Sequence, residues 1–133
     1  MPSVIVAPMP PFRSLKVWQH AQRLAIECAR VAKRFPEADQ KVLAVQLLRA
    51  SSSVPLNIAE GSARKGAREF RRYLDVARGS LAEVESALEL ARELEYLDVE
   101  EYGRLDAIAT ETAKTLWGLL RKVSDATTRR PTP

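Results

Sequence analysis

The sequence contains few of the residues from which disulfides, metal sites and acid–base sites are built. Among its 133 residues there is one cysteine, Cys28, and one histidine, His20. A single cysteine excludes an intrachain disulfide, which fits a reducing compartment. A di-metal carboxylate site in a helical bundle needs two Glu-x-x-His pairs, and the residue three positions before His20 is Val17. We therefore expect no metal ion and no cofactor, and we expect Cys28 to be a small core residue.

Long apolar runs are also absent. No stretch approaches the ~18 continuous apolar residues of a membrane span. The opening residues, MPSVIVAPMPPF, carry no cationic segment, and their apolar run is too short for a secretory signal. A composition of 46% hydrophobic and 29% charged residues is typical of a soluble globular domain. The sequence therefore predicts a cytoplasmic protein that makes no contact with a membrane.

Glycine and proline are scarce in the body of the chain. There are five glycines and eight prolines, and only Pro36 and Pro55 lie away from the two ends. Alanine, leucine, arginine and glutamate, which favour helices, dominate the part between those ends. The sequence has no sustained period-two alternation and no Asn-Gly or Asp-Gly turn, so it gives no indication of a β-strand. The length suggests one domain, which we place at residues 14–125, between a flexible proline-rich segment at 1–13 and a flexible segment at 126–133.

Apolar residues recur at steps of three and four over four segments, which is the period of an α-helix. The segments cover residues 14–35, with Ser14 as the N-cap, and then 37–64, 67–96 and 100–125. Short connections between long helices predict an all-α fold, an antiparallel up-down-up-down four-helix bundle. The expected core stripes of the first and third helices are Trp18, Ala21, Ala25, Cys28, Ala32 and Phe35, and Phe70, Leu74, Ala77, Leu81, Val84, Leu88 and Ala91.

The apolar stripe of the second segment continues through Pro55 without a change of phase, from Val54 to Ile58. Val54 would be a poor N-cap for a helix that began at Pro55. A single helix with a kink at Pro55 is therefore the better interpretation. Because proline removes one backbone donor and crowds the carbonyl group of Ser51, we expect the hydroxyl groups of residues 51–53 to bond the freed groups.

A polar stripe runs beside the apolar one on the same segment. Its members are Gln46, Arg49, Ser53, Asn57 and Glu60, at steps of three and four. One interpretation is a solvated face. The other is a partly buried network that pairs Arg49 with Glu60 or with a neighbour's acid, and in which Asn57 and Glu60 bond backbone groups near Pro55. Neither interpretation implies catalysis.

Two further patterns resemble catalytic motifs but lack the context that those motifs need. Gly61 and Gly66 have the spacing of a phosphate-binding loop, yet Ala67 and Arg68 follow them and the preceding segment is helical. The serines at 51–53 have no positioned base, since the single histidine lies on the first segment. We expect no catalytic residues and no enzymatic activity.

Two helices carry more apolar residues than one small core can bury. Contacts between subunits would cover the surplus, and the alternative is that these residues cover one another or the chain ends. We expect a homo-oligomer. The residues concerned are Val42, Leu43, Val45, Leu47 and Leu48 on the second helix, and Leu116, Trp117, Leu119 and Leu120 on the fourth.

The chain is basic, with a formal net charge of +4, and its charges are segregated. The third helix is basic at its start and acidic over residues 83–101, which opposes the usual preference of the helix dipole. One end of the bundle then gathers positive charge, which fits phosphate contacts that read no sequence. Charge that serves solubility alone, or an acidic protein partner, would explain the same pattern. The basic residues of this end are Arg64, Lys65, Arg68, Arg71 and Arg72, joined through the topology by Arg13, Lys16, Arg121 and Lys122.

The order of several stretches resembles a known family. These stretches are LKVWQHAQRLA, QLLRASSSVPLNIAEGSAR and EFRRYLDVARGSLAEVESALELA. They are similar to the four-helix-bundle proteins of the bacterial 23S rRNA intervening-sequence family, also called S23 ribosomal proteins. One departure is Gly66, which stands where the family often has a Ser or Thr N-cap, at a cost of a few tenths of a kcal/mol.

The resemblance implies a fold, an assembly and a kind of partner. It implies an antiparallel four-helix bundle that forms a homopentameric barrel, without catalytic residues. The family is similar to the accessory variability proteins of diversity-generating retroelements, which bind nucleic acid and a reverse transcriptase through basic surfaces. We therefore expect a non-enzymatic, oligomeric protein that binds RNA or DNA without sequence specificity, or a scaffold. The alternative is a protein-interaction adaptor, such as a reverse-transcriptase accessory subunit.

Overall fold

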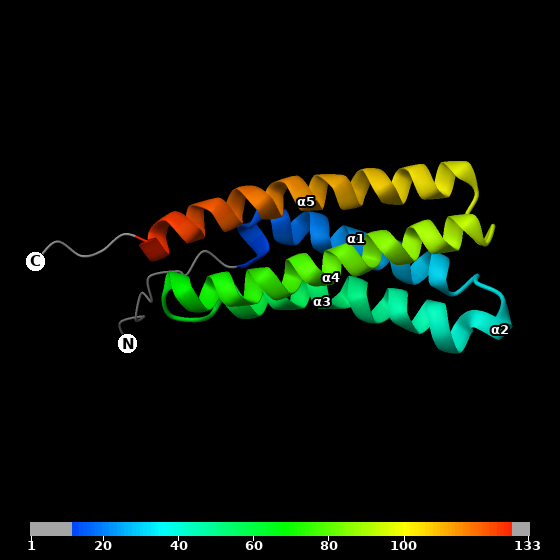
Figure 1. Cartoon of the computed structure of the whole chain (residues 1–133), viewed down its shortest axis with the longest axis horizontal. Helices are drawn as coiled ribbons and strands as arrows, with labels where there is room; N and C mark the ends of the chain where they lie inside the picture. Colours follow the sequence, from blue (N-terminus) through cyan, green and yellow to red (C-terminus); the bar gives the residue numbers. More distant parts are fainter. Residues whose placement is uncertain (1–11, 129–133) are drawn as a thin grey trace, which may run out of the picture.

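The chain folds into an antiparallel bundle of long helices, which confirms the all-α prediction. The computed structural model describes residues 12–128, and within that range there is no β-strand. Helix α1 (Lys16–Ala32) is followed by a continuous helical stretch made of α2 (Glu37–Asp39), η2 (Gln40–Ala44) and α3 (Val45–Ser62). Helices α4 (Ala67–Glu93) and α5 (Val99–Thr128) complete the bundle (Figure 1).

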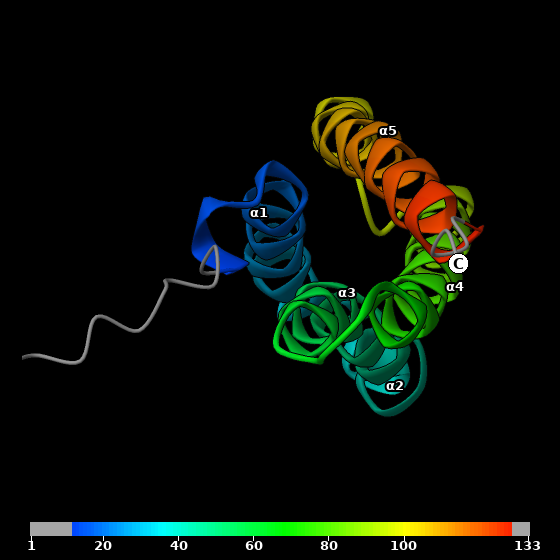
Figure 2. The same ribbon diagram turned by 90° about the vertical axis from the view of Figure 1, so that its left-hand side faces the viewer.

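The helices form a closed square in which each packs against two neighbours. Helix α1 contacts α3 and α5, and α4 contacts the same two helices from the other side (Figure 2). Successive helices run in opposite directions, which is the predicted up-down-up-down order. The end of α3, the start of α4, the start of α1 and the end of α5 therefore share one end of the bundle.

The ends of the bundle differ in detail from the expected boundaries. Phe12–Ser14 forms a short 3-10 helix, η1, and the N-cap of α1 is Leu15 rather than Ser14. The side chain of Gln19 donates a hydrogen bond to the carbonyl oxygen of Arg13 at 2.8 Å and holds this turn against α1. Helix α5 continues past the expected end at residue 125 as far as Thr128. Residues 1–11 and 129–133, most of the two expected flexible segments, lie outside the described residues.

The core stripe predicted for the third helix is confirmed. That of the first helix is confirmed in part, because four of its six residues are buried, namely Ala21, Cys28, Ala32 and Phe35. On α4 every predicted residue from Leu74 to Ala91 is buried, and Phe70 is half-buried. On α1 the buried face runs through Val17, Leu24 and Val31, and two residues of the predicted stripe, Trp18 and Ala25, are half-buried. The core is closed from α3 and α5 by Leu47, Val54, Ile58, Leu105, Ile108, Ala109 and Leu116.

Cys28 is fully buried in this core, as its role as a small apolar residue requires. Burial raises the pKa of its thiol to about 12, against the opposing effect of the nearby Ser51 side chain. A thiol with such a pKa is not a nucleophile at neutral pH. Cys28 is therefore a packing residue.

The second helix passes through Pro55 as one continuous element, as predicted, but it begins with π-helical turns that the sequence pattern did not indicate. These turns, Gln40–Ala44, lie between the short α2 and α3. The side-chain amide of Gln40 donates to the carbonyl groups of Ala32 at 3.1 Å and Phe35 at 2.5 Å. Gln40 thereby occupies carbonyl groups that the end of α1 leaves without helical partners.

The hydroxyl groups before Pro55 bond one turn earlier than expected. Ser51 and Ser52 both donate to the carbonyl oxygen of Leu48, at 3.3 Å and 2.7 Å, and not to the carbonyl of Ser51. The predicted role of Asn57 is confirmed, because its amide nitrogen donates to the carbonyl oxygen of Ser53 at 2.8 Å. Side-chain bonds of this kind compete with the backbone ladder and often bend a helix.

The stretch Glu37–Ser62 has the length and mean hydropathy of a membrane-spanning helix, with 44% of its most apolar window buried inside the bundle. Core helices of bundles pass the same test, so length and hydropathy do not identify a span. The apolar residues of this helix that lie outside the core form an exposed surface.

Helices α3 and α4 approach most closely at Gly61. A Cβ atom at this position would lie 2.8 Å from Cβ of Tyr73 and 2.9 Å from Cδ1 of Phe70. Both distances are below the normal limit for carbon atoms. The carbonyl oxygen of Phe70 lies 3.3 Å away, so backbone as well as side chains would have to move.

We predict that Gly61→Ala destabilises the protein, although alanine is the better helix former. Overpacking of this kind costs about 1–3 kcal/mol, against a propensity gain of up to about 1 kcal/mol. Gly103→Ala is the matched control, because a Cβ atom on Gly103 in α5 meets nothing within 4 Å. Urea titration should show a lower free energy of unfolding for the Gly61 variant and an equal or higher one for the control. Equal stability gains in both variants would contradict the close approach.

Helix α4 ends in a left-handed residue that is not a glycine. Glu95 has φ 64°, and the amide of Tyr96 donates to the carbonyl oxygen of Ala91 at 2.8 Å. This arrangement is a common helix terminus in which glycine is the favoured residue. The left-handed conformation gives the Glu95 side chain no compensating hydrogen bond or ion pair within residues 12–128.

Glu95→Gly should therefore stabilise the protein by about 0.5–1 kcal/mol, because a left-handed conformation costs a non-glycine residue about that much or more. Glu93→Gly, inside the last turn of α4, is the control and should destabilise by about 1 kcal/mol. Thermal unfolding followed by circular dichroism distinguishes the two. A fall in melting temperature for both variants would be incompatible with this reading of the turn.

Candidate nucleic-acid interface

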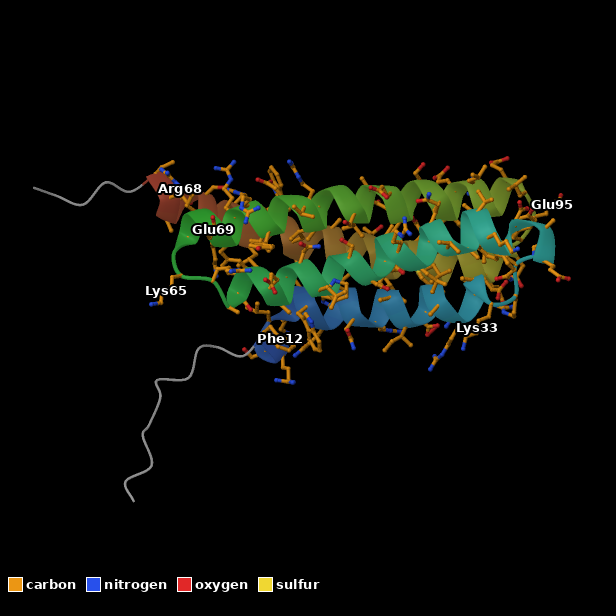
Figure 3. All side chains as sticks on the ribbon, turned by 90° about the horizontal axis from the view of Figure 1, so that it is seen from below. Phe12, Lys33, Lys65, Arg68, Glu69 and Glu95 are labelled. Carbon is orange, nitrogen blue, oxygen red and sulfur yellow. The ribbon has the colours of Figure 1, made fainter. Side chains whose placement is uncertain are left out.

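The predicted basic cluster lies on the turn between α3 and α4 and on the first turns of α4. The turn depends on Gly66, the N-cap of α4, which has φ 89° and no side-chain acceptor. Lys65 and Arg68 project from this end of the bundle, whereas Lys33 and Glu95 lie at the opposite end (Figure 3). Both Lys65 and Arg68 are exposed, and neither makes an ion pair within residues 12–128. Their charges are therefore open to a ligand.

Arg64 and Arg72 are held in place by an aromatic ring that the sequence analysis did not select. The guanidinium carbons lie 5.2 Å and 4.7 Å from the ring centre of Tyr73. Arg64 also pairs with Glu60, and Arg72 pairs with Glu69 at 3.1 Å. The hydrogen bonds to these carboxylates raise the pKa values of both arginines. The two arginines are thus ordered but partly neutralised. Tyr73 lies one helical turn after Glu69, the partner of Arg72. This spacing in the sequence could have identified Tyr73 as part of the site.

Arg71 faces a different side of α4. Its Nε atom lies 3.8 Å from Asp75, which also pairs with Arg78 at 3.4 Å. Arg71, Arg78 and Arg121 line one groove between α4 and α5, together with Trp117. The cluster predicted as one patch is therefore divided, with Arg71 and Arg121 on the side of the bundle rather than on its end.

The helix ends contributed by α1 and α5 join the turn as the topology predicted. Lys122 and Arg64 line the same hollow of about 390 Å³ beneath the turn. Lys122 and Lys16 line a second hollow between α1 and α5. Arg13 lies over the ring of Phe12, with its guanidinium carbon 4.6 Å from the ring centre. The end surface therefore combines charges from α1, α4, α5 and the turn between α3 and α4, namely Lys16, Arg64, Lys65, Arg68, Arg72 and Lys122, with Arg13 on η1.

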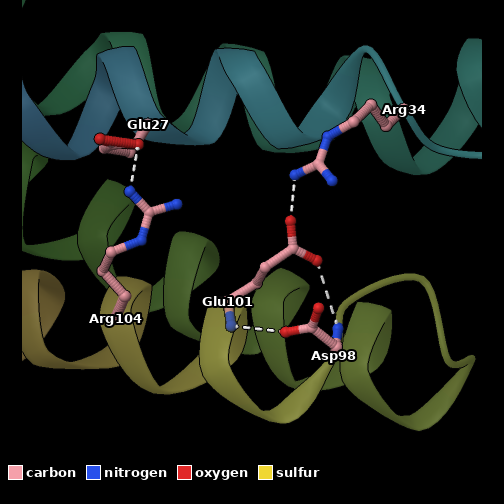
Figure 4. A network of polar contacts seen from close by, with 5 residues as sticks. All are labelled: Glu27, Arg34, Asp98, Glu101 and Arg104. Carbon is pink, nitrogen blue, oxygen red and sulfur yellow. Dashed lines mark hydrogen bonds and ion pairs between the residues drawn. The ribbon is translucent and has the colours of Figure 1, made fainter.

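The opposite end is acidic, and part of its charge holds α5 against α1. Arg34 on the connection after α1 pairs with Glu101, and Arg104 donates to the buried Glu27 at 3.0 Å (Figure 4). The amide of Glu101 donates to Asp98 at 2.8 Å, and Glu101 accepts from the amide of Asp98 at 3.3 Å. This reciprocal cap starts α5. Glu27, Asp98 and Glu101 thus have structural partners at this end, whereas Lys65 and Arg68 make no ion pair in the described part of the chain.

The polar stripe on α3 is only partly a network. Ser53 shares a hydrogen bond of 2.7 Å with Ser80 on α4 and accepts another from Asn57 at 2.9 Å. Glu60 pairs with Arg64 rather than with Arg49. Gln46 and Arg49 are exposed, and within residues 12–128 no ion pair or side-chain hydrogen bond involves them. The solvated interpretation therefore holds for one half of the stripe and the network interpretation for the other.

No group of three or more His, Cys, Asp or Glu side chains in the described range has the arrangement of a metal site. Within the same range, no buried polar side-chain atom lacks a hydrogen-bond partner. The features that this structure offers to a ligand are consequently charge, aromatic surface and shallow hollows.

These features define a class, the antiparallel four-helix bundle with one uncompensated basic end. The chain belongs to the 23S rRNA-intervening sequence protein family, whose model matches residues 13–118. A crystal structure of a protein with unknown function from the S23 ribosomal protein family of Bacteroides thetaiotaomicron is similar. It is 28% identical, the match covers 78% of this chain and 97% of that one, and the TM-score is 0.72. A comparison with curated proteins gave no match.

Ser53 connects the candidate interface helix α4 to α3, and we predict that Ser53→Ala lowers stability by about 1 kcal/mol. The substitution leaves the half-buried Ser80 hydroxyl and the Asn57 amide without their mutual partner. Ser86→Ala, on the exposed face of α4, is the control and should stay within about 0.5 kcal/mol of the parent. Denaturant unfolding of the two variants measures the difference. A neutral Ser53→Ala would mean that this contact contributes nothing to the packing of α3 on α4.

Proposed function

We propose that this protein is a non-enzymatic, cytoplasmic nucleic-acid-binding protein that contacts phosphate groups through the basic end of the bundle. The observation that carries the proposal is the exposed pair Lys65 and Arg68, whose charges no acid in the described residues neutralises. Lysine and arginine that neutralise phosphates release counterions, which supplies affinity without sequence readout. The acidic character of the other end leaves a single end for such a ligand.

The family's name, 23S rRNA-intervening sequence protein, supports an RNA context. The charges of the basic end within residues 12–128 suit phosphate groups, which RNA and DNA share, so the proposed contacts apply to both. Tyr73 has a structural part in the site, because it holds Arg64 and Arg72 at defined positions. The protein needs no cofactor for this function.

We also propose that the working form is a homo-oligomer, a pentamer by family resemblance. The support in this structure is the number of large apolar residues that the single chain leaves exposed, among them Leu56 at 66% and Trp117 at 57%. Copies arranged around an axis parallel to the bundle would bring their basic ends to one rim. Several weak phosphate contacts on one rim bind far more tightly than one.

The decisive experiment is a salt titration of RNA and DNA binding with the double variant Lys65→Glu/Arg68→Glu. If each residue contacts one phosphate, affinity should fall at least tenfold, and the slope of log K against log salt should decrease in magnitude by about 2 per subunit. The matched control is the double variant Lys33→Glu/Lys41→Glu, which makes the same charge change with two exposed lysines at the opposite end. The control should retain the slope of the parent protein.

Two outcomes would contradict the proposal. An unchanged affinity in the double variant would remove the basic end as the binding surface. Equal losses in the double variant and the control would show that net charge alone sets the affinity. Failure of the parent protein to bind free RNA or DNA would favour the alternative, an adaptor that binds another protein such as a reverse transcriptase.

A further inference from the structure

Helix α3 presents an apolar surface that no other element within residues 12–128 covers. Val45, Leu48 and Leu56 are 40%, 37% and 66% exposed. With Ser52 and Arg49 they line a hollow of about 530 Å³ on the outside of the bundle. Solvent-facing apolar side chains gathered in one hollow mark an interaction surface. We call it the α3 hollow.

A second apolar surface lies between α4 and α5. Trp117 is 57% exposed at its centre, and the groove around it of about 290 Å³ is lined by Leu81, Ala82 and Leu120. Tryptophan is among the residues most enriched at the centres of protein interfaces. Helix α4 lies between α3 and α5 in the bundle (Figure 2). The lining residues of this surface, the Trp117 surface, lie on α4 and α5, so it is on a different side of the bundle from the α3 hollow.

The two surfaces lie at the same level along the bundle, as their positions relative to α4 show. Ser53, at the edge of the α3 hollow, is bonded to Ser80 on α4 at 2.7 Å. Arg78, two positions before Ser80, lines the groove with Trp117. Two helical residues correspond to about 3 Å. A rotation about an axis parallel to the bundle keeps every residue at its level, so it can bring Trp117 of one copy opposite the α3 hollow of the next.

The charges beside the two surfaces are complementary and match in level too. On α3, Arg49 lies four residues from Ser53 towards the acidic end, about 6 Å along the axis. On α4, which runs the other way, Glu85 lies five residues from Ser80 towards the same end, about 7.5 Å. Within residues 12–128 neither Arg49 nor Glu85 makes an ion pair. Partial burial, and then the nearby Asp106, raise the pKa of Glu85, so the single chain gives this carboxylate no stabilising partner.

We propose that the α3 hollow of one copy of this chain receives Trp117 of a second copy, and that Arg49 pairs with Glu85 across the contact. Each copy then uses two different surfaces, so the contact is head-to-tail and repeats around a ring. This inference rests on the proposed oligomer and specifies its interface. It leaves Lys65 and Arg68 uncovered, since both lie on the end of the bundle rather than on these sides.

Sedimentation velocity and light scattering of purified variants test the contact. Trp117→Ala and Leu48→Glu should each convert the oligomer largely to monomer, with at least a hundredfold weaker association. Val99→Ala is the control for loss of an exposed apolar side chain, since Val99 is 86% exposed at the far turn. Circular dichroism of each variant establishes that the bundle is folded.

A charge exchange tests the register. Arg49→Glu alone and Glu85→Arg alone should each weaken association at least tenfold, and the double exchange should restore at least half of the lost affinity. Glu93→Arg is the control for a new positive charge on α4. The singly and doubly exchanged proteins are compared at the same ionic strength, because salt screens such pairs.

The outcomes separate this contact from the proposed oligomer. A monomeric parent protein would overturn both. A parent oligomer that persists in Trp117→Ala and Leu48→Glu would leave the oligomer standing and overturn this interface. Dissociation by those two variants without rescue by the double exchange would overturn the pairing of Arg49 with Glu85 and hence the proposed register.

Discussion

The close approach of α3 and α4 at Gly61 is the constraint on which the functional end of this bundle depends. With no side chain at Gly61, the start of α4 lies directly against the end of α3, and Tyr73 comes within reach of that helix end. The ring of Tyr73 then contacts Arg64 from the turn after α3 and Arg72 from α4. The turn between the helices is thereby short and fixed, and Gly66 supplies the positive φ that closes it. The basic surface is consequently carried on rigid elements, which lowers the entropy lost when a ligand is bound.

Charged residues are paired at one end of the bundle and partly unpaired at the other. This difference explains why α4 is basic at its start and acidic at its end, a pattern that the helix dipole disfavours. At the acidic end, Glu101 and Glu27 pair with Arg34 and Arg104 and so join α5 to α1. At the basic end, acids neutralise Arg64 and Arg72 but leave Lys65 and Arg68 open. The unfavourable helix-dipole cost is at most about 1 kcal/mol per charge. Pairing within the fold offsets that cost at the acidic end, and a polyanionic ligand would offset it at the other.

The sequence predicted the fold closely because its strongest signals are local. The α4 stripe, with steps near the heptad, needs no knowledge of partners to be read. The α1 stripe was predicted only in part. Four of its six residues are buried, but Trp18 and Ala25 lie at the margin of a face that also includes Val17, Leu24 and Val31. Alanine fits both a core and its margin, so it fixes phase poorly. The π-helical turns at Gln40–Ala44 and the contacts of Tyr73 depend on residues brought together only by folding, and no local pattern contains them. For the same reason the split of Arg71 and Arg121 from the end surface was not predictable.

The proposed ring of copies would explain both the exposed apolar residues and the basic end. The α3 hollow and the Trp117 surface occupy different sides of the bundle, so they cannot satisfy each other within one chain. They lie at one level, as the Ser53–Ser80 bond shows. A rotation about an axis parallel to the bundle would therefore bring the Trp117 surface of one copy against the α3 hollow of the next. The same rotation keeps Lys65 and Arg68 of every copy on one rim. The open charges that a single chain presents there, Lys65 and Arg68 among them, are too few for strong phosphate binding at physiological salt. The interface that buries Trp117 would therefore also build the charge density that the proposed nucleic-acid contact requires.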